Sequence, residues 1–200
     1  SMKRPWFDQL APAWDSLPGQ SDTAVRAETF LQKVVPPGCS ALLDAGAGTG
    51  ILVAPLLRLP APPASIIELD FAPAMLAENR RKHGPLPQVR YVCADLGAPP
   101  FPAASFDCAL LFSALPHVED PRAALAALLA LLRPGGRLAV GHLMSSDALN
   151  ALHASIGGAV AADRLPPAAD LARLCVSLGA RVLLAEESPQ EYTVLVEKSA

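Results

Sequence analysis

Residues 42–52 read LLDAGAGTGIL, a short apolar run that leads directly into three glycines spaced two residues apart. The apolar run predicts a buried strand, and the glycines predict a tight turn whose backbone can lie against a ligand without a Cβ in the way. The sequence that follows is typical of a helix, whose first turn offers unpaired N–H groups. This order predicts an α/β fold with a site for a small adenosine-bearing cofactor at the turn.

Apolar runs and helical patterns alternate along the whole chain. We expect strands at 40–45, 64–70, 89–94, 106–112 and 136–142, and helices at 50–58, 73–83, 121–132 and 168–178. Such alternation is typical of a parallel sheet with helices on both faces, in which ligands bind at the carboxyl ends of the strands. Two further strands, at 180–186 and 191–197, are joined by a connection short enough only for an antiparallel pair. We therefore expect one domain over residues 1–200, with a doubly wound seven-stranded sheet and an antiparallel last strand.

Three further segments place an acidic residue or a turn beside an expected strand. Residues 66–76, IIELDFAPAML, end a strand at Asp70, whose carboxylate can accept both ribose hydroxyls of an adenosine and would repel a 2′-phosphate. Residues 89–96, VRYVCADL, end the next strand beside Asp95, and residues 132–140, LRPGGRLAV, contain a Pro-Gly-Gly turn before the fifth strand.

These four segments, in this order, resemble the motifs of class I S-adenosylmethionine-dependent methyltransferases of the small-molecule type, with domains of the methyltransferase 11 or 25 kind. A dinucleotide-binding fold would require a third glycine at position 51, where this chain has Ile51. The resemblance implies a Rossmann-like sheet, S-adenosylmethionine as cofactor and S-adenosylhomocysteine as product. The cofactor-binding residues that it implies are Asp44, Gly46, Ala47, Gly48, Gly50, Asp70, Phe71, Met75, Ala94, Asp95, Leu96 and Ser113.

Within that set, the resemblance implies that Asp95 accepts the adenine amino group, that Leu96 packs on the ring and that Ser113 contacts the methionine moiety. Ser113 could equally be a simple turn residue. Asp44 can cap the glycine turn while it lies near the amino group of the cofactor.

Two segments outside the motifs are candidates for covering the site. Residues 6–15, WFDQLAPAWD, resemble the lead-in of small-molecule methyltransferases, in which this part covers the pocket, so we expect residues 1–35 to form a helical lid. Large aromatic residues near a terminus can equally stabilise a core. Residues 143–167 form an insertion that in this fold usually builds the acceptor pocket.

Three histidines are candidate catalytic residues. His117 follows the fourth strand, at a position where many small-molecule methyltransferases carry a histidine, and either contacts substrate or shapes its loop. His142 ends the fifth strand, and His153 would share a helix face with Asn150, so these side chains could hydrogen-bond an acceptor, hold a metal or simply cap the sheet. A hydroxyl or protonated-amine acceptor could lose its proton to one of the histidines, whereas a thiolate would need only positioning. We assign no metal site.

Composition restricts the partners. The net charge of −3 argues against a nucleic-acid partner, because phosphate binding requires a basic surface. With 52% hydrophobic and 18% charged residues, the chain still lacks the apolar stretch of roughly 20 residues that a membrane span needs. The four cysteines show no paired spacing, so we expect buried reduced thiols. We expect a cytoplasmic protein and leave its oligomeric state open.

The identity of the methyl acceptor and the class of function both leave alternatives open. Enzymes that methylate exocyclic amines or glutamine carry an acid or asparagine with Pro-Pro and an aromatic residue after the fourth strand. Residues 112–115, FSAL, lack this motif, so a small-molecule acceptor is expected. A nicotinamide-dependent reductase could use a similar sheet, but neither Tyr91 nor Tyr192 begins a Tyr-x-x-x-Lys pair. A module that binds the cofactor and does no chemistry is the remaining alternative.

Overall fold

The computed structural model describes residues 3–17 and 22–200, in which strands and helices alternate as the sequence predicts. Seven strands form one sheet with the order β3-β2-β1-β4-β5-β7-β6. The strands are β1 (Ala41–Ala45), β2 (Ser65–Asp70), β3 (Val89–Cys93), β4 (Phe106–Phe112), β5 (Leu132–His142), β6 (Ala180–Ser188) and β7 (Glu191–Lys198). Strands β1 to β5 run parallel, and β7 is antiparallel to both of its neighbours. The predicted α/β sheet with an antiparallel last strand is confirmed.

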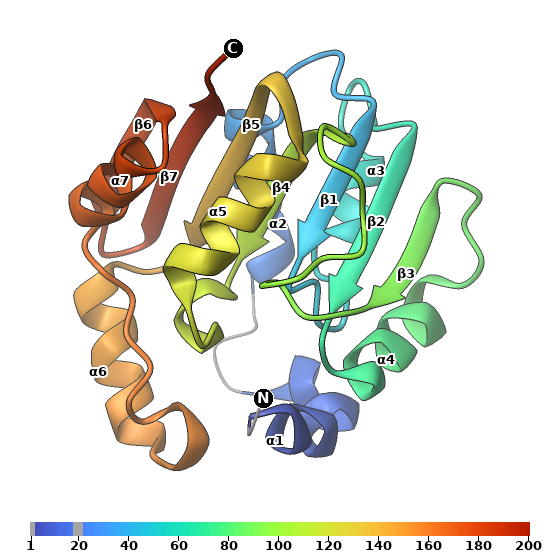
Figure 1. The fold of residues 1–200 in the computed structure, drawn as a ribbon. Helices are drawn as coiled ribbons and strands as arrows, with labels where there is room; N and C mark the ends of the chain where they lie inside the picture. Colours follow the sequence, from blue (N-terminus) through green and yellow to red (C-terminus); the bar gives the residue numbers. More distant parts are fainter. Residues whose placement is uncertain (1–2, 18–21) are drawn as a thin grey trace.

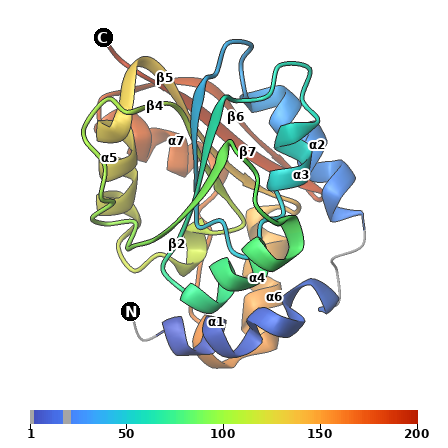
Figure 2. The same cartoon turned by 90° about the vertical axis from the view of Figure 1, so that its right-hand side faces the viewer.

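Helices cover both faces of this sheet, with α5 and α7 in front of it and α2 and α3 behind it (Figure 1). A quarter turn shows the sheet nearly edge-on between these two layers (Figure 2). The helices are α1 (Arg4–Leu10), α2 (Thr23–Val34), α3 (Val53–Leu57), α4 (Pro73–His83), α5 (Pro121–Leu131), α6 (Ser146–Ile156) and α7 (Ala168–Ser177), with 3-10 turns η1 (Ala11–Ser16), η2 (Leu115–His117) and η3 (Gly158–Val160).

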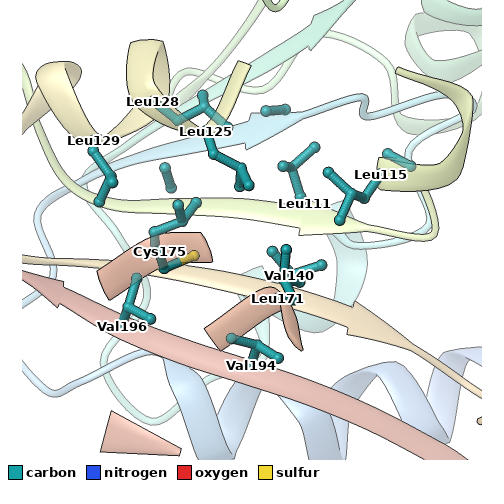
Figure 3. Packing of buried hydrophobic residues seen from close by; sticks show 14 of the residues in the cluster. Leu111, Leu115, Leu125, Leu128, Leu129, Val140, Leu171, Cys175, Val194 and Val196 are labelled. Carbon is teal, nitrogen blue, oxygen red and sulfur yellow. The ribbon is translucent and has the colours of Figure 1, made fainter. Parts of the chain in front are cut away.

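A separate apolar core fills each face. On one face Leu125 and Leu128 of α5 and Leu171 of α7 pack on Val140 and Val194 of the sheet (Figure 3). On the other, the buried side chains of α2 and α3 pack on β1 and β4. A parallel strand that is covered on both faces must be apolar on both sides, which explains the unbroken apolar runs of β1 and β2.

The structure corrects two predicted boundaries. Helix α3 begins at Val53 and not at 50, because Gly50 has φ +84°, outside the helical region. Strand β5 begins at Leu132 and not at 136, because Leu132 already pairs with Phe106 before an irregular stretch, after which the ladder resumes between Arg137 and Cys108.

The carboxyl ends of the parallel strands meet at one edge of the sheet, and α1 and α6 both lie beyond that edge (Figure 1). Segments that are far apart in the sequence therefore enclose the loops that follow β1, β2 and β4. This is the edge at which a parallel α/β sheet binds ligands.

Candidate cofactor and acceptor site

A cavity of about 460 Å³ lies at the carboxyl ends of the parallel strands. Its walls come from the loops after β1, β2, β3 and β4 and from the N-terminal segment. The predicted cofactor residues that line it are Gly46, Ala47, Gly48, Asp70, Phe71, Met75, Asp95, Leu96 and Ser113. Asp44, Gly50 and Ala94 do not line it.

The three glycines of the first loop have different reasons to be glycine. A Cβ on Gly46 would lie 2.6 Å from Ala114 Cβ, and one on Gly50 would lie 2.1 Å from Asn79 Oδ1. Gly48 has φ +55°, and a Cβ there would meet nothing within 4 Å. Gly46 and Gly50 are thus required for packing, whereas Gly48 presents bare backbone to open space in the cavity wall.

Asp70 is held in place by backbone N–H groups. Its Oδ2 accepts from Gly48 N and its Oδ1 accepts from Ala72 N, both at 2.9 Å. Burial raises the pKa of Asp70, although these backbone hydrogen bonds oppose the rise. The carboxylate therefore stands pre-oriented at the wall of the cavity, at the end of β2.

A second pair of carboxyl groups is buried below the glycine loop. Asp44 of β1 lies opposite Glu68 of β2, and both are almost entirely inaccessible to solvent. Burial raises the pKa of both groups, and the proximity of the two carboxylates raises that of Glu68 further. Asn79 donates to Glu68 Oε2 at 2.8 Å and to Gly48 O at 3.4 Å, so this buried pair supports the loop from below.

Glu68 and Asn79 are not among the site residues predicted from the sequence. The signal for Glu68 was an acidic residue in the middle of an apolar strand, because an unpaired buried carboxylate is rare.

The remaining loops add a strained residue and a turn. Ser113, directly after β4, has φ +55° and donates its backbone N–H to Gly141 O at 2.9 Å. A positive φ in a residue other than glycine is uncommon and is frequent at ligand sites. Asp95 Oδ1 accepts from Gly97 N at 2.7 Å, which fixes the turn after β3.

The wall of the cavity is acidic. Its carboxylate residues are Asp15, Asp70, Asp95, Glu119 and Asp120. Within residues 3–17 and 22–200, no lysine or arginine lines it. Asp15 is paired with Lys82, and the other carboxylates favour a cation over a phosphate or another anion.

The N-terminal segment lies over this cavity and is tied to its loops. Phe7 and Trp14 line it, and the ring centroid of Phe7 is 5.7 Å from that of Phe71. Asp8 Oδ1 accepts from Ala74 N at 3.0 Å, and Asp15 accepts from Thr49 Oγ1 at 2.7 Å.

The rest of the predicted lid is placed differently. Helix α2 packs with α3 on the sheet, and of its residues only Thr23 lines the cavity. Residues 1–2 and 18–21 of the predicted lid lie outside the described residues.

The three candidate histidines occupy different environments, and only His117 lines the cavity. Its Nδ1 lies 2.6 Å from Asp163 Oδ2, and its ring centroid is 5.1 Å from that of His153. His142 is buried against Tyr192, and burial lowers its pKa to about 3, so it is neutral at pH 7. His153 is also buried, with Nδ1 3.3 Å from Asp163 O.

The insertion at 143–167 reaches the cavity indirectly. None of its residues lines the cavity, and Asn150 exchanges two hydrogen bonds with the backbone of Leu165. Asp163, through His117, is the connection to the cavity wall. A direct role of the insertion in an acceptor pocket stays a prediction.

Known proteins of one family resemble the central part of this chain. Residues 43–140 match the family described as a methyltransferase domain. The chain is 34% identical to an uncharacterized methyltransferase of Mycobacterium tuberculosis over 128 residues, which are 64% of this chain and 63% of that protein. The predicted resemblance to class I S-adenosylmethionine-dependent methyltransferases is confirmed. The segment that matches this family contains the glycine loop, Asp70, Asp95 and Ser113.

Other relatives extend the comparison. A demethylmenaquinone methyltransferase of Clavibacter sepedonicus is 34% identical over 138 residues, which are 67% of this chain and 55% of that protein. A solved S-adenosylmethionine-dependent methyltransferase from Thermotoga maritima shares the fold with a TM-score of 0.73, at 17% identity, over 96% of this chain and 98% of that one. The chain spans about 63% of the length of the first curated relatives.

Two further expectations concern residues outside the cavity. Cys39, Cys108 and Cys175 are free and buried as expected, but the expectation is wrong for Cys93, which is exposed at the end of the edge strand β3. In the part of the chain that the structure describes, no group of three or more His, Cys, Asp or Glu residues could hold a metal ion. No helix among the same residues is both long enough and apolar enough to cross a membrane.

Proposed function

We propose that this protein transfers the methyl group of S-adenosylmethionine to a small-molecule acceptor. The observation that carries the proposal is the acidic cavity at the end of β1 and β2, which is bordered by bare backbone at Gly48 and by the anchored carboxylate of Asp70. The match to the methyltransferase family supports the same cofactor.

The cavity fits S-adenosylmethionine better than a nicotinamide dinucleotide. The sulfonium is a cation and the molecule has no phosphate, so acidic walls favour it. A dinucleotide brings two phosphates and needs helix N–H groups or basic side chains to hold them. Ile51 stands where the third glycine would be, and α3 spans only Val53–Leu57. These features disfavour the reductase alternative.

Each wall residue has a role in this proposal. Asp70 accepts the ribose hydroxyls, Asp95 accepts the adenine amino group and Leu96 packs on the ring. Phe7 and Trp14 exclude water from the far side. The bound cofactor supplies a methyl group on a sulfonium, an activated leaving group, so the protein mainly aligns the acceptor for in-line displacement.

The acceptor is a small molecule without a strong negative charge. The acidic walls argue for a neutral or cationic acceptor, and the net charge of −3 argues against nucleic acid. The name of one relative, a demethylmenaquinone methyltransferase, supports a small-molecule acceptor as a class. A cytoplasmic location stays a prediction.

Calorimetry tests the cofactor part of the proposal. The protein is titrated with S-adenosylmethionine, S-adenosylhomocysteine and NADPH, and the titration is repeated on Asp70→Ala. The matched control is Asp147→Ala, which removes an exposed carboxylate on α6. Hydrogen bonds to a charged group contribute about 1.5–3 kcal/mol, so Asp70→Ala should lower the affinity for the two sulfur compounds by about 10- to 100-fold.

The outcomes separate the alternatives. The proposed site is supported if the protein binds both sulfur compounds, if Asp70→Ala weakens this binding and if Asp147→Ala leaves it unchanged. Binding of NADPH alone, or of none of the three, refutes it. A screen of small acceptors that follows release of S-adenosylhomocysteine then separates a methyltransferase from a module that binds the cofactor without chemistry.

A further inference from the structure

Asp163 holds His117 in a fixed orientation at the cavity wall. The two residues are 46 positions apart, and the distance from Asp163 Oδ2 to His117 Nδ1 is 2.6 Å. The other carboxylate oxygen, Oδ1, forms an ion pair with Lys3 Nζ. Asp163 is only 5% exposed and does not line the cavity, whereas His117 does.

The hydrogen bond selects one form of the neutral imidazole. Hydrogen bonds to His117 and Lys3 lower the pKa of Asp163 although burial opposes them, so the carboxylate is ionised and can only accept. The proton of the neutral ring must then lie on Nδ1, which leaves Nε2 with a free electron pair. A base oriented in this way by a carboxylate is a recurrent arrangement in catalysis.

The other two histidines are less suited to that role. His142 is fully buried, and burial lowers its pKa to about 3, so its ring stays neutral in the neutral pH range and is a weak base. Burial also lowers the pKa of His153, whose Nδ1 faces the backbone of Asp163. Neither side chain lines the cavity.

We infer that His117 is a general base, positioned by Asp163, and that the acceptor is a neutral molecule that attacks through a hydroxyl group. This inference rests on the proposed methyltransferase function. The acidic walls, which include Glu119 and Asp120, disfavour an acceptor that enters as an anion, such as a thiolate. A neutral hydroxyl is a weak nucleophile and becomes effective when a base removes its proton during the transfer.

The step balances as follows. The acceptor proton passes to His117 Nε2, and the acceptor oxygen uses the electron pair of its O–H bond to form the bond to the methyl carbon. The sulfur keeps the electron pair of the broken S–C bond, which leaves a neutral thioether. The imidazolium is stabilised by Asp163 and later releases its proton to water.

Nuclear magnetic resonance of the histidine side chains tests the positioning. The whole protein, labelled with nitrogen-15 and saturated with S-adenosylhomocysteine, is compared with Asp163→Asn and with Lys3→Met. We expect the Nδ1–H form of His117 in the unchanged protein and in Lys3→Met, which removes the ion pair but keeps the carboxylate. Asp163→Asn should move the proton toward Nε2. An Nε2–H form in the unchanged protein, or no change in Asp163→Asn, would overturn the inference.

Kinetics test the catalytic role with neutral phenols, alcohols and thiols as acceptors and release of S-adenosylhomocysteine as the signal. For a hydroxyl acceptor, His117→Gln should lower kcat by about 10²- to 10⁴-fold, the usual contribution of a general base. Asp163→Asn should lower kcat with little change in KM. Turnover of thiols alone, or of hydroxyl acceptors with kcat unchanged in His117→Gln, refutes the inference. If the unchanged protein does not bind S-adenosylmethionine, the proposed function itself is refuted.

Several charged or titratable groups lie near His117 and are therefore part of any pH profile. Asp163, His153 and His142 interact with His117 itself. Lys3 pairs with Asp163, Arg164 interacts with His153, and Glu119 and Asp120 line the same cavity. The comparison of Asp163→Asn with Lys3→Met keeps all but one of these groups constant in each variant, so a difference confined to Asp163→Asn is assigned to the His117 hydrogen bond.

Discussion

The buried carboxyl pair below the glycine loop should make the protein less stable at higher pH, and Asp44→Asn should remove the part of that loss that comes from Asp44. Burial raises the pKa of Asp44 from 3.8 to about 7. The folded state therefore binds a proton that the unfolded state has released, and stability falls as the pH rises from 3.8 to about 7. A difference of roughly 3 pH units at about 1.4 kcal/mol per unit corresponds to at most about 4 kcal/mol.

An asparagine resembles the protonated acid in shape and does not ionise, so it avoids this penalty. The assay is urea unfolding of the two proteins at about pH 5 and at about pH 8, without ligand, with the free energy of unfolding as readout. From about pH 5 to about pH 8, the free energy of unfolding of Asp44→Asn should rise by about 3 kcal/mol relative to that of the unchanged protein. The reason is that about two of the roughly three pH units over which the unchanged protein loses stability lie between these two pH values.

Asp107→Asn is the matched control. Although burial opposes it, hydrogen bonds from the backbone of Ala41 and Ser40 and from Arg133 lower the pKa of Asp107. The ionised Asp107 stabilises the fold fully at a pH above 3.8, its pKa in the unfolded chain. This stabilisation is lost only as the pH falls through the lower pKa of the folded state. The difference between Asp107→Asn and the unchanged protein should therefore be the same at both pH values. A constant difference for Asp44→Asn as well would refute the reasoning about the buried pair.

Three further substitutions test the loop and the lid. Gly50→Ala should destabilise the fold by about 1–3 kcal/mol or more in urea unfolding, since its Cβ would overlap Asn79, and an unchanged midpoint would contradict the packing. Gly48→Ala meets no neighbour and should cost only about 1–2 kcal/mol for its positive φ, yet it should weaken S-adenosylmethionine in calorimetry; unchanged affinity would mean that the loop does not face the cofactor. Phe7→Ala should speed cofactor dissociation in stopped-flow measurements, because Phe7 lines the cavity in a small cluster separate from both sheet cores, and an equal rate would remove its lid role.

Local patterns were sufficient for most of the fold. The apolar runs of β1 and β2 and the prolines at the start of α4 and α5 mark elements whose type depends on neighbouring residues alone. The boundary errors arose where one residue competes with a pattern. The positive φ of Gly50 delays α3, and the pairing of Leu132 with Phe106 extends β5. Neither effect follows from periodicity.

The candidate site divides in the same way. Asp70 ends β2, and Gly48 and Asp95 lie three and two residues after the ends of β1 and β3, so the topology of a parallel sheet alone brings them to one edge. Asp163 does not follow any strand of the parallel sheet. Its place beside His117 depends on the path of the insertion and on Lys3, near the opposite end of the chain. A loop residue whose partner is set by such a path has no signal in its own neighbourhood.

This difference also bears on what each part of the site can determine. The cofactor half of the cavity is formed by the loops after the strands, which backbone hydrogen bonds to Asp70 and Asp95 hold together. His117 is oriented by Asp163, and Asp163 is paired with Lys3 of the N-terminal segment, which covers the same cavity. A displacement of that segment would separate Lys3 from Asp163 and would uncover the cavity at the same time. The N-terminal segment therefore contacts both the cavity and the carboxylate that orients His117, so the two halves of the site meet at Asp163.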